Sequence, residues 1–500
     1  MSKRKKKNAV TLILLLFSLA GLIGFYFWYT NREPVAEEAE KEETIALSTI
    51  DTEKVSSLHY IYEDTDLTLI KEEGMWVAKE DKNRPINQDR VKSILSIIDE
   101  ISATRIVADT ADDLEDFGLA VPTSYLQVTL TDGSEITLQI GNKVSTGDGY
   151  YALVNEDNKV YLVDTSYGSG LKYTNADITA VAKDLTIEAG NIRRIRVDNR
   201  DGEDFELLYQ EDNTLDNSGS AMFPWVILKP YAQEYTADSQ AVTTLQEKYT
   251  TFDYIKCVDY NATDLSKYGL DHPMSVLSLD YLETRTEKLE KPEKNPDTGE
   301  EITEKTFYDP KEYQITIGNL DEDNNYYIMI DGDKAVYTID KDAIDNMVLI
   351  DVFSLLNKFV AIPNIEMVEK IDIDIDGKAY TMNMERTTGK NDKGEEEIKN
   401  AYFYNGKEVK EDVFKDVYQT MISAKYDAPI KEEINTEGIA PHLTMTFYLN
   451  DEKKTVISTS YLPYDDSFYM IKNRETRFFA DKRKIDEIVT AIEEFKSVED

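Results

Sequence analysis

Side chains that could carry out chemistry are scattered along this 500-residue sequence and form no recognised catalytic pattern. His59, His272 and His442 are its only histidines, and none has a His or Cys partner at the spacing of metal ligands. No Ser or Cys near them has a setting typical of nucleophilic catalysis, and the single Cys257 excludes an internal disulfide. The 97 acidic residues offer so many carboxylate pairs that none of them singles out a glycosidase site.

Two acidic stretches imitate the start of a calcium-binding loop. Asp372–Gly377 has the sequence DIDIDG, but Asn383 occupies the twelfth position, where such a loop needs a bidentate Glu. Asp321–Asn325 fails in the same way, with Gly332 at that position. No Walker loop, nucleophile elbow or dinucleotide fingerprint is present. We therefore predict no catalytic residue, no metal site and no cofactor, and we expect that the protein is not an enzyme.

The strongest pattern is a repeated stretch without catalytic groups. Ala111–Pro122, ADDLEDFGLAVP, returns 151 positions later as Ala262–Pro273, ATDLSKYGLDHP, with six of twelve positions identical and Phe117 exchanged for Tyr268. Ile434–Pro441, INTEGIAP, is a shorter third version. The chain is therefore expected to contain repeats of one domain.

Each position of this motif suits a structural role. Asp113 and Asp264 suit the N-cap of a short helical turn, where a carboxylate accepts backbone N–H groups. Gly118 and Gly269 suit the left-handed position that ends such a turn, and the following proline leads into extended chain. We interpret the motif as a corner between a helix and a sheet; a ligand-holding turn is the alternative.

The N-terminus predicts a membrane anchor. A basic block, Ser2–Lys7, precedes the uncharged stretch Val10–Tyr29, which is long enough as a helix to cross a bilayer and ends in aromatics. The charge asymmetry predicts a cytoplasmic N-terminus and an extracellular remainder, with the cell membrane as location. A cleaved signal peptide is the alternative, but bulky aromatics occupy the place of a cleavage site. We assign residues 1–30 to the tail and anchor and residues 31–46 to a linker.

Net charge limits the partners. The whole chain has a formal charge of −41. The part after the first thirty residues has 51 basic and 97 acidic side chains and is therefore even more strongly negative. Such a surface repels nucleic acid, so we expect no nucleic-acid partner.

The first repeat is assigned to residues 47–185. Its expected strands are followed by a helix capped by Asn87, then by the corner and a hairpin meander with a turn at Asp132–Gly133. A closing helix is expected around Ala176–Lys183. The expected strands are Val55–Tyr62, Leu67–Ile70, Met75–Val77, Tyr125–Leu130, Ile136–Ile140, Tyr150–Leu153 and Val160–Val163, and the expected helix face is Val91, Ile94, Leu95, Ile98 and Ile101.

The second repeat, residues 186–360, follows the same order. Residues 283–310 form a hydrophilic insertion, which predicts a long hairpin tip or a flexible loop. Asp342–Val360 predicts a closing helix, and Asp238 caps an earlier one. The expected strands are Ile192–Val197, Phe205–Leu208, Val276–Leu282, Ile315–Gly318, Tyr326–Tyr327 and Val336–Ile339, with Trp225 in the role of Trp76 and Val242, Leu245, Tyr249 and Phe252 on the helix face.

A diverged third repeat fits residues 361–500. Tyr402–Tyr404 stands in the place of the tryptophan, and amphipathic helices are expected along two faces. Strands followed by segregated helices indicate an α+β fold: a transmembrane helix, then two clear repeats and one diverged repeat of antiparallel sheet plus helices. The third repeat's expected strands are Val368–Ile375, Leu443–Leu449, Phe468–Met470 and Phe478–Ala480, and its helix faces are Val409, Val413, Val417, Tyr418 and Met421, then Ile485, Ile488, Val489, Ile492 and Phe495.

Together these elements resemble a bacterial family, domain of unknown function 4340. The resemblance rests on the tryptophan, the corner, the Ile140–Gly141 turn, the Tyr150–Ala152 strand and the Val160–Val163 strand, in fixed order and twice over. It implies an extracytoplasmic domain behind one N-terminal helix, often encoded beside gliding-motility-type ABC transporter components. It brings no catalytic residues.

Two functions follow as hypotheses. The first is a non-enzymatic accessory or scaffold protein of a membrane complex, anchored by its N-terminal helix and docking with a membrane protein such as an ABC transporter permease. The second is a binding module for cell-wall glycan or another extracellular polymer. Trp76, Trp225 and the tyrosines would then be sugar platforms, although filling cores and sheet faces is their commoner role. An envelope hydrolase is a third, more remote possibility.

Overall fold

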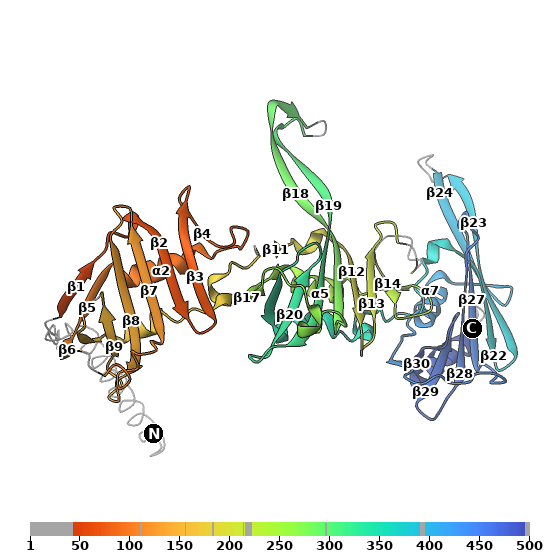
Figure 1. Ribbon diagram of the computed structural model, residues 1–500. Coiled ribbons are helices and arrows are strands. Elements are labelled where there is room, and N and C mark those ends of the chain that lie inside the picture. Colours follow the sequence, from red (N-terminus) through yellow and green to blue (C-terminus); the bar gives the residue numbers. More distant parts are fainter. Residues whose placement is uncertain are drawn as a thin grey trace, which may run out of the picture. The chain divides into compact units, whose positions relative to one another are not determined.

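The computed structural model describes residues 44–110, 113–155, 157–182, 185–213, 215, 223–295, 298–390 and 396–495. The chain divides into two compact units, Met1–Ile178 and Thr179–Asp500. Within the described ranges no helix is both long and apolar enough to cross a membrane, and the predicted anchor Val10–Tyr29 lies outside them. The fold is α+β and mostly β, built from antiparallel sheets with a few helices, as the sequence predicts at that level (Figure 1).

The first unit contains one large sheet in the order β4-β3-β2-β7-β8-β9-β10-β6. A second, two-stranded sheet joins β1 (Ile45–Thr49) to β5 (Glu100–Ala103). Helix α2 (Gln88–Ile98) begins at its N-cap Asn87, whose side chain accepts from the backbone N–H of Arg90. The other elements are β2 (Val55–Tyr62), β3 (Thr65–Glu72), β4 (Met75–Ala78), β6 (Arg105–Ala108), β7 (Ser124–Leu130), β8 (Glu135–Lys143), β9 (Tyr150–Val154), β10 (Val160–Val163), α3 (Thr165–Gly170) and α4 (Asn175–Ile178).

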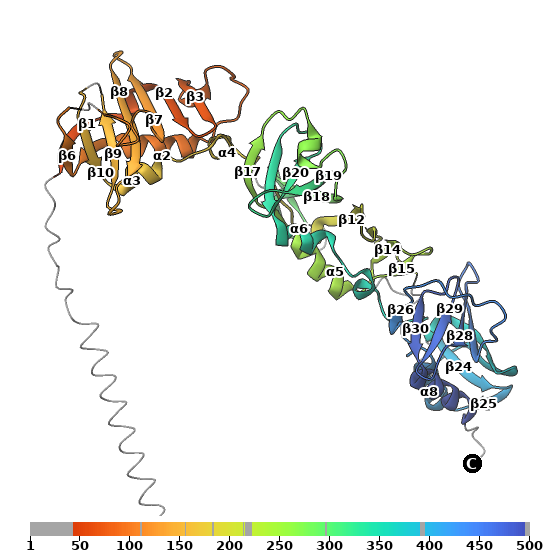
Figure 2. The same ribbon diagram turned by 60° about the horizontal axis from the view of Figure 1, so that its bottom comes forward.

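The second large sheet, called the second sheet below, lies in the second unit and has the order β15-β14-β13-β12-β18-β19-β20-β21-β17. Its helices α5 (Ser239–Gln246) and α6 (Lys341–Val348) lie next to each other against the sheet (Figure 2). Strands β11 (Leu185–Thr186) and β16 (Thr251–Phe252) form a separate, two-stranded antiparallel sheet. Its strands are β12 (Ile192–Asn199), β13 (Phe205–Tyr209), β14 (Trp225–Lys229), β15 (Tyr235–Thr236), β17 (Tyr254–Asp259), β18 (Ser275–Lys294), β19 (Glu301–Leu320), β20 (Asn325–Ile330) and β21 (Val336–Asp340).

The third sheet, in the same unit, has the order β25-β24-β23-β22-β27-β28-β29-β30-β26. This is the strand order of the second sheet position by position, so the diverged third repeat has the same topology. Repetition of one architecture is therefore confirmed. Its elements are β22 (Val368–Ile375), β23 (Lys378–Lys390), β24 (Glu396–Tyr404), β25 (Lys407–Val409), α7 (Glu411–Met421), β26 (Ala428–Pro429), β27 (Leu443–Leu449), β28 (Val456–Pro463), β29 (Phe468–Lys472), β30 (Phe478–Asp481) and α8 (Lys482–Glu493).

Several predicted helix boundaries are wrong. Val409 lies in β25, Phe495 follows the end of α8, and the helix expected around Ala176–Lys183 ends at Ile178. Ile101 lies in β5 and Phe252 in β16, because each helix ends earlier and the next apolar residue joins a short strand. The predicted helix Asp342–Val360 stops at Val348. Asp351 then caps a 3-10 turn, Val352–Leu355, and extended chain follows.

One face of each sheet carries the core. Strands such as β27 alternate between buried and half-buried residues, because successive side chains point to opposite faces. The buried residues of the second and third sheets form one continuous cluster that runs from Ile187 to Phe495. The first sheet has a separate cluster of its own.

Candidate functional site

The repeated corner is a packing element. In the second repeat, a small cluster of Tyr268, Leu270 and Val336 lies apart from the main core, with Leu265 packed against it. In the third repeat, Ile434 and Ile439 of the shortened corner pack in the same way, against Ile430, Leu462 and Met470. The corner thus covers the second face of the last strands of the sheet. This supports the structural interpretation over a ligand-holding turn.

The predicted caps of the corner are confirmed. Asp264 is the N-cap of η4 (Leu265–Tyr268) and accepts from the backbone N–H of Ser266 at 3.1 Å; Asp113 accepts from that of Glu115 at 3.2 Å. Gly118 and Gly269 have φ of 68° and 69°, the left-handed region expected of them.

A second glycine, which the sequence analysis missed as a partner of the corner, locks it to the sheet. A Cβ on Gly141 of β8 would lie 2.3 Å from the carbonyl oxygen of Phe117, and one on Gly318 of β19 would lie 2.2 Å from that of Tyr268. The recurring Gly-Asn pairs that follow Ile140 and Ile317 were the available signal. The third repeat has Leu462–Pro463 at this place and lacks the lock.

The three histidines lie in different sheets or their turns and do not form one site. His59 Nε2 is 2.8 Å from Asp66, and His442 Nδ1 is 3.0 Å from Asp376, with its ring stacked on Tyr469. The corner aromatics Phe117 and Tyr268 contact Tyr151 and Tyr327 of the first two repeats, whereas His442 stacks on Tyr469, the counterpart of Tyr150 and Tyr326. The side chain of His272 is 88% exposed.

The aspartates of the calcium-like stretch are each engaged separately. Asp372 pairs with Lys370 at 2.8 Å, Asp374 accepts from the backbone N–H of Gly377, and Asp376 contacts His442. Ile373 and Ile375 are buried in β22, which is a strand as the alternative interpretation expected. Over the described parts of the chain, no group of three or more His, Cys, Asp or Glu residues is arranged to hold a metal ion.

Tyrosine–aspartate pairs account for several shifted pKa values. Burial, then the adjacent carboxylate, raises the pKa of Tyr161 beside Asp157 to about 12. The same causes raise the pKa of Tyr337 beside Asp333. These phenols stay protonated at neutral pH and donate to the carboxylates, so they fasten turns. Trp76 and Trp225 are 7% and 5% exposed, which excludes them as open sugar platforms and confirms the core role.

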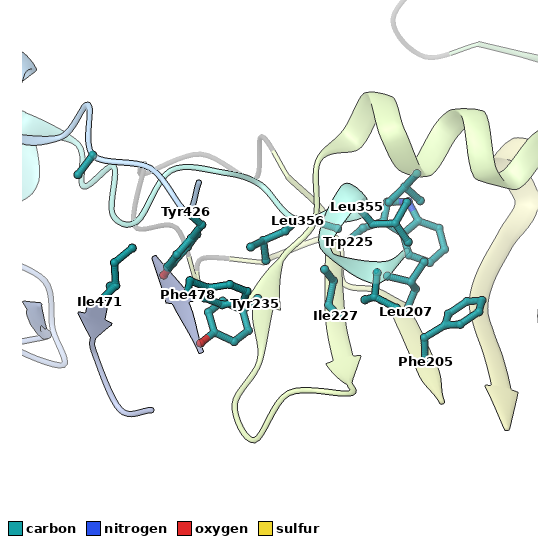
Figure 3. Packing of buried hydrophobic residues seen from close by; sticks show 14 of the residues in the cluster. Phe205, Leu207, Trp225, Ile227, Tyr235, Leu355, Leu356, Tyr426, Ile471 and Phe478 are labelled. Carbon is teal, nitrogen blue, oxygen red and sulfur yellow. The ribbon is translucent and has the colours of Figure 1, made fainter. Parts of the chain in front are cut away.

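An aromatic cluster joins the second and third sheets. The Phe478 ring contacts Tyr235, Tyr426 and Tyr231 at centroid distances of 5.3, 4.7 and 5.2 Å. Figure 3 shows Tyr235, Tyr426 and Phe478 packed together, with Leu356 lying between them and the group around Trp225. The two sheets are therefore fixed to one another by core packing.

A chain of polar side chains lines the same junction. Gln233 donates to Asn473 at 3.1 Å, and Asn473 donates to the hydroxyl of Tyr426 at 2.9 Å. The Tyr235 hydroxyl donates to Glu475 at 3.0 Å. Burial, opposed by nearby aspartates, lowers the pKa of Lys358 to about 8, and its ammonium lies 3.1 Å from the centroid of the Phe353 ring.

The segment Leu355–Val360 connects the second and third repeats, and its backbone is hydrogen-bonded to both of their sheets. On one edge, Asn357 N–H donates to Thr236 and Asp238 N–H donates to Leu355. On the other edge, Val360 N–H donates to Ala424 and Tyr426 N–H donates to Lys358. The predicted helix is replaced here by extended chain because these backbone partners lie far away in sequence.

A cleft of about 440 Å³ lies between this connecting segment and the Gln233–Thr236 segment that contains β15. It is lined by the Gln233–Thr236 segment, by residues within 357–362 and 453–458, by Asn473 and Arg474 of the β29–β30 turn, and by the single residues Leu215 and Tyr426. Val456 and Phe359 present exposed apolar surface there, at 54% and 39% exposure. A neighbouring hollow of about 610 Å³ shares Gln233, Glu234 and Arg474 with it.

The insertion at residues 283–310 is a paired-strand arm. Strand β18 pairs with β12 only as far as Tyr281, and β19 pairs with β20 only from Ile315 onward. Between these limits β18 and β19 pair with each other alone, and the arm projects from the sheet (Figure 1). The hairpin alternative is confirmed over the described residues.

The family model of the Domain of unknown function (DUF4340) matches residues 76–222 and 225–435. Each match begins at the tryptophan of a repeat, Trp76 or Trp225, and extends into the following repeat. No curated protein and no solved structure matches the chain. Because the two matches cover most of the sequence and start at equivalent positions, the chain belongs to the DUF4340 family.

Proposed function

We propose that the chain is a non-enzymatic scaffold on the outer face of the cell membrane, which docks with a membrane protein such as an ABC transporter permease. The observation that carries this proposal is the β18–β19 arm. An isolated two-stranded ribbon is marginally stable in water, so a chain that maintains one beyond its sheet has a use for its surface.

The arm is reinforced by its own side chains on one face. Arg285 forms ion pairs with Asp309 at 3.1 Å and with Glu287, and its guanidinium lies 4.7 Å from the centroid of the Phe307 ring. Lys305, two residues before Phe307 on β19, places its ammonium 5.4 Å from the centroid of the same ring. These contacts stabilise the ribbon, and at its base Asn191 of the repeat body donates to the Thr284 hydroxyl at 2.8 Å.

The other face of the arm is nearly uncharged close to the sheet. The cross-strand pairs there are Leu282 with Pro310, Thr284 with Tyr308 and Thr286 with Thr306. Tyr308 is 58% exposed. A neutral strip with one large exposed aromatic is suited to contact another protein, because its burial desolvates few charges.

The anchor sequence supports a membrane partner. A helix over Val10–Tyr29 would hold the arm near other membrane proteins and raise its effective concentration for them. The same charge asymmetry supports an extracellular position. Polymer binding is the alternative function; the burial of both repeat tryptophans removes its strongest motif, but Tyr308 and Tyr464 keep exposed rings.

Affinity purification from detergent-solubilised membranes tests the proposal. In an arm-trimmed variant, an Asn-Gly turn joins Glu283 directly to Asp309, a pair that faces each other across the two strands. It should lose the membrane partner that the wild-type chain retains. Deletion of Met1–Thr30 should also lose most of it.

A matched control trims the corresponding protrusion of the third sheet by joining Thr387 to Lys399, which are also cross-strand partners. This variant should retain the partner. If the arm-trimmed chain retains the same partner at wild-type yield, the docking role of the arm is wrong. Recovery of wall glycan without any membrane protein would favour the polymer-binding alternative.

A further inference from the structure

The β18–β19 arm has an open strand edge. Strand β18 pairs with β12 only up to Tyr281, opposite Ile192, and beyond that point no strand of the described chain lies along its outer edge (Figure 1). On its other edge, β18 pairs with β19 without a register shift as far as Lys288. Residues 282–288 therefore form a regular strand with one free edge.

The backbone groups of the even-numbered residues point to this free edge. In an antiparallel strand the N–H and C=O groups of alternate residues point to opposite edges. The C=O of Gln314 in β19 accepts from Asp331 and so points away from β18. The odd-numbered residues of β19 therefore bond to their odd-numbered partners in β18. Within the described residues, no backbone partner on the free edge is found for Leu282, Thr284, Thr286 and Lys288.

The side chains of this edge complement a second copy of themselves. When two identical strands pair antiparallel about a two-fold axis at Thr286, Arg285 lies opposite Glu287 of the second copy, and Glu287 lies opposite its Arg285. Both are non-hydrogen-bonded pairs, whose side chains approach each other most closely. Moving the axis by one residue places either Arg285 or Glu287 opposite itself, and like charges at such positions are unfavourable.

The rest of the repeat limits the register further. An axis at Thr284 would also bring opposite charges together, but Asn191 of the repeat body donates to the Thr284 hydroxyl at 2.8 Å, and β12 occupies the edge from Tyr281 inward. Toward the tip, the pairing of β18 with β19 becomes irregular after Lys288. Thr286 is thus the position at which a second copy meets a free, regular edge and opposite charges.

Net charge favours the arm over the rest of the chain as a contact between copies. Residues 283–291 carry three acidic and three basic side chains and are neutral, in a chain of net charge −41. Two copies of so acidic a chain repel each other over most of their surface. At the arm the charges instead alternate in sign, so they can pair across an interface.

We propose that two copies of the chain join through their arms, β18 against β18 about an axis at Thr286, into a four-stranded antiparallel sheet. A two-stranded ribbon is marginally stable in water, and pairing gives each arm the further strands that it lacks. The two-fold axis is perpendicular to this sheet, so the neutral faces of both arms, each with its Tyr308, lie on the same side. The inference goes beyond the scaffold function, because it concerns contact between copies and needs no membrane partner.

Disulfide formation in the purified full chain in detergent micelles tests the register. Thr286→Cys places two thiols across the axis in a hydrogen-bonded pair, whose Cα separation of about 5.5 Å suits a disulfide. Thr306→Cys is the matched control, because Thr306 is the exposed cross-strand partner of Thr286 on β19, and its two copies lie about 14 Å apart. Mild oxidation should give at least about tenfold more dimer with Thr286→Cys. The wild type, whose single Cys257 is buried, should give none.

Charge reversals test the pairing itself. Added to the Thr286→Cys chain, Arg285→Glu puts two acidic side chains at each contact and Glu287→Arg puts two basic ones there. Each should therefore reduce the disulfide dimer at least about tenfold. When the two variants are mixed, every contact again joins opposite charges, so mixed dimers should recover to within about twofold of the parent yield. Damage within one arm, such as loss of the Arg285–Asp309 ion pair, cannot be repaired by a second chain.

Equal dimer yields from Thr286→Cys and Thr306→Cys, or no dimer from either, would overturn the inference. So would mixed dimers that form no better than those of each variant alone. The purified sample contains no other protein, so these outcomes do not depend on docking with a membrane partner. If they fail while the arm-trimmed chain still loses its partner, the scaffold function stands and the contact between copies does not.

Discussion

Alanine substitutions at three glycines of the second unit separate backbone strain from steric contact in the corner. Gly438 has φ of 80° and no heavy atom within 4 Å of an added Cβ, so Gly438→Ala adds only the left-handed strain, about 1 kcal/mol. Gly269 has φ of 69°, and its Cβ would also lie 2.5 Å from the side chain of Asn319. Since Asn319 is exposed and can rotate away, we expect Gly269→Ala to cost about 1.5–2.5 kcal/mol.

Gly318→Ala is the decisive member of the series. Gly318 has no positive φ, so alanine there would stabilise the fold by about 0.4–1 kcal/mol if space allowed. Its Cβ would instead lie 2.2 Å from the backbone oxygen of Tyr268, which cannot move without shifting the corner. Overpacking of this kind costs about 1–3 kcal/mol, and partial exposure of Leu270 adds to it.

Calorimetry of the full chain measures the series, because all three glycines lie in the unit Thr179–Asp500, which we expect to unfold in one transition. We expect the order of destabilisation Gly318→Ala, then Gly269→Ala, then Gly438→Ala. A stability of Gly318→Ala equal to or above that of Gly438→Ala would refute the locked corner. Equal losses for Gly269→Ala and Gly438→Ala would show that the Asn319 contact contributes nothing.

Three further outcomes are expected. In the folded chain the pKa of Lys358 is about 8, below its ordinary 10.5, so between these pH values the folded state binds fewer protons than the unfolded state. The free energy of unfolding should therefore rise between about pH 8 and 10.5, by about 1 kcal/mol after allowance for the exposure of Lys358 to solvent. Denaturant unfolding of Lys358→Met should lack this rise. Phe478→Ala should cost about 3–5 kcal/mol and lower hydrogen-exchange protection in the second and third sheets together, since both share one core; loss confined to the third sheet would contradict that core. Protease added to intact, wall-stripped cells should digest the region after Asn31, and complete protection would contradict the proposed topology.

Local patterns predicted many elements well, because their signals lie within one segment. The strands Val55–Tyr62 and Val368–Ile375 are found with the bounds expected, and Asn87 and Asp238 cap their helices. The capping aspartates and left-handed glycines of the corner were likewise predictable, since each has a role in its own turn.

The rest depends on partners distant in sequence. Apolar residues after Val348 continue a helical spacing, but Leu356 and Phe359 instead form bridges with Ala237 and Lys425. The junction cleft is assembled from separate segments between Leu215 and Arg474, and no single one of them carries a signal for it. The third repeat departs from the sequence pattern at Tyr402 and Gly438, yet the shared strand order preserves its fold.

The docking role of the arm is tested most directly by photo-crosslinking in intact cells. A photoreactive residue replaces Tyr308, the exposed aromatic on the neutral face of the arm, with Leu349, 59% exposed on the body of the same repeat, as the control position. We expect a crosslink from position 308 to a membrane protein, absent from position 349 and lost on deletion of Met1–Thr30. Crosslinks from position 308 to wall glycan alone, or equal crosslinking from both positions, would contradict it.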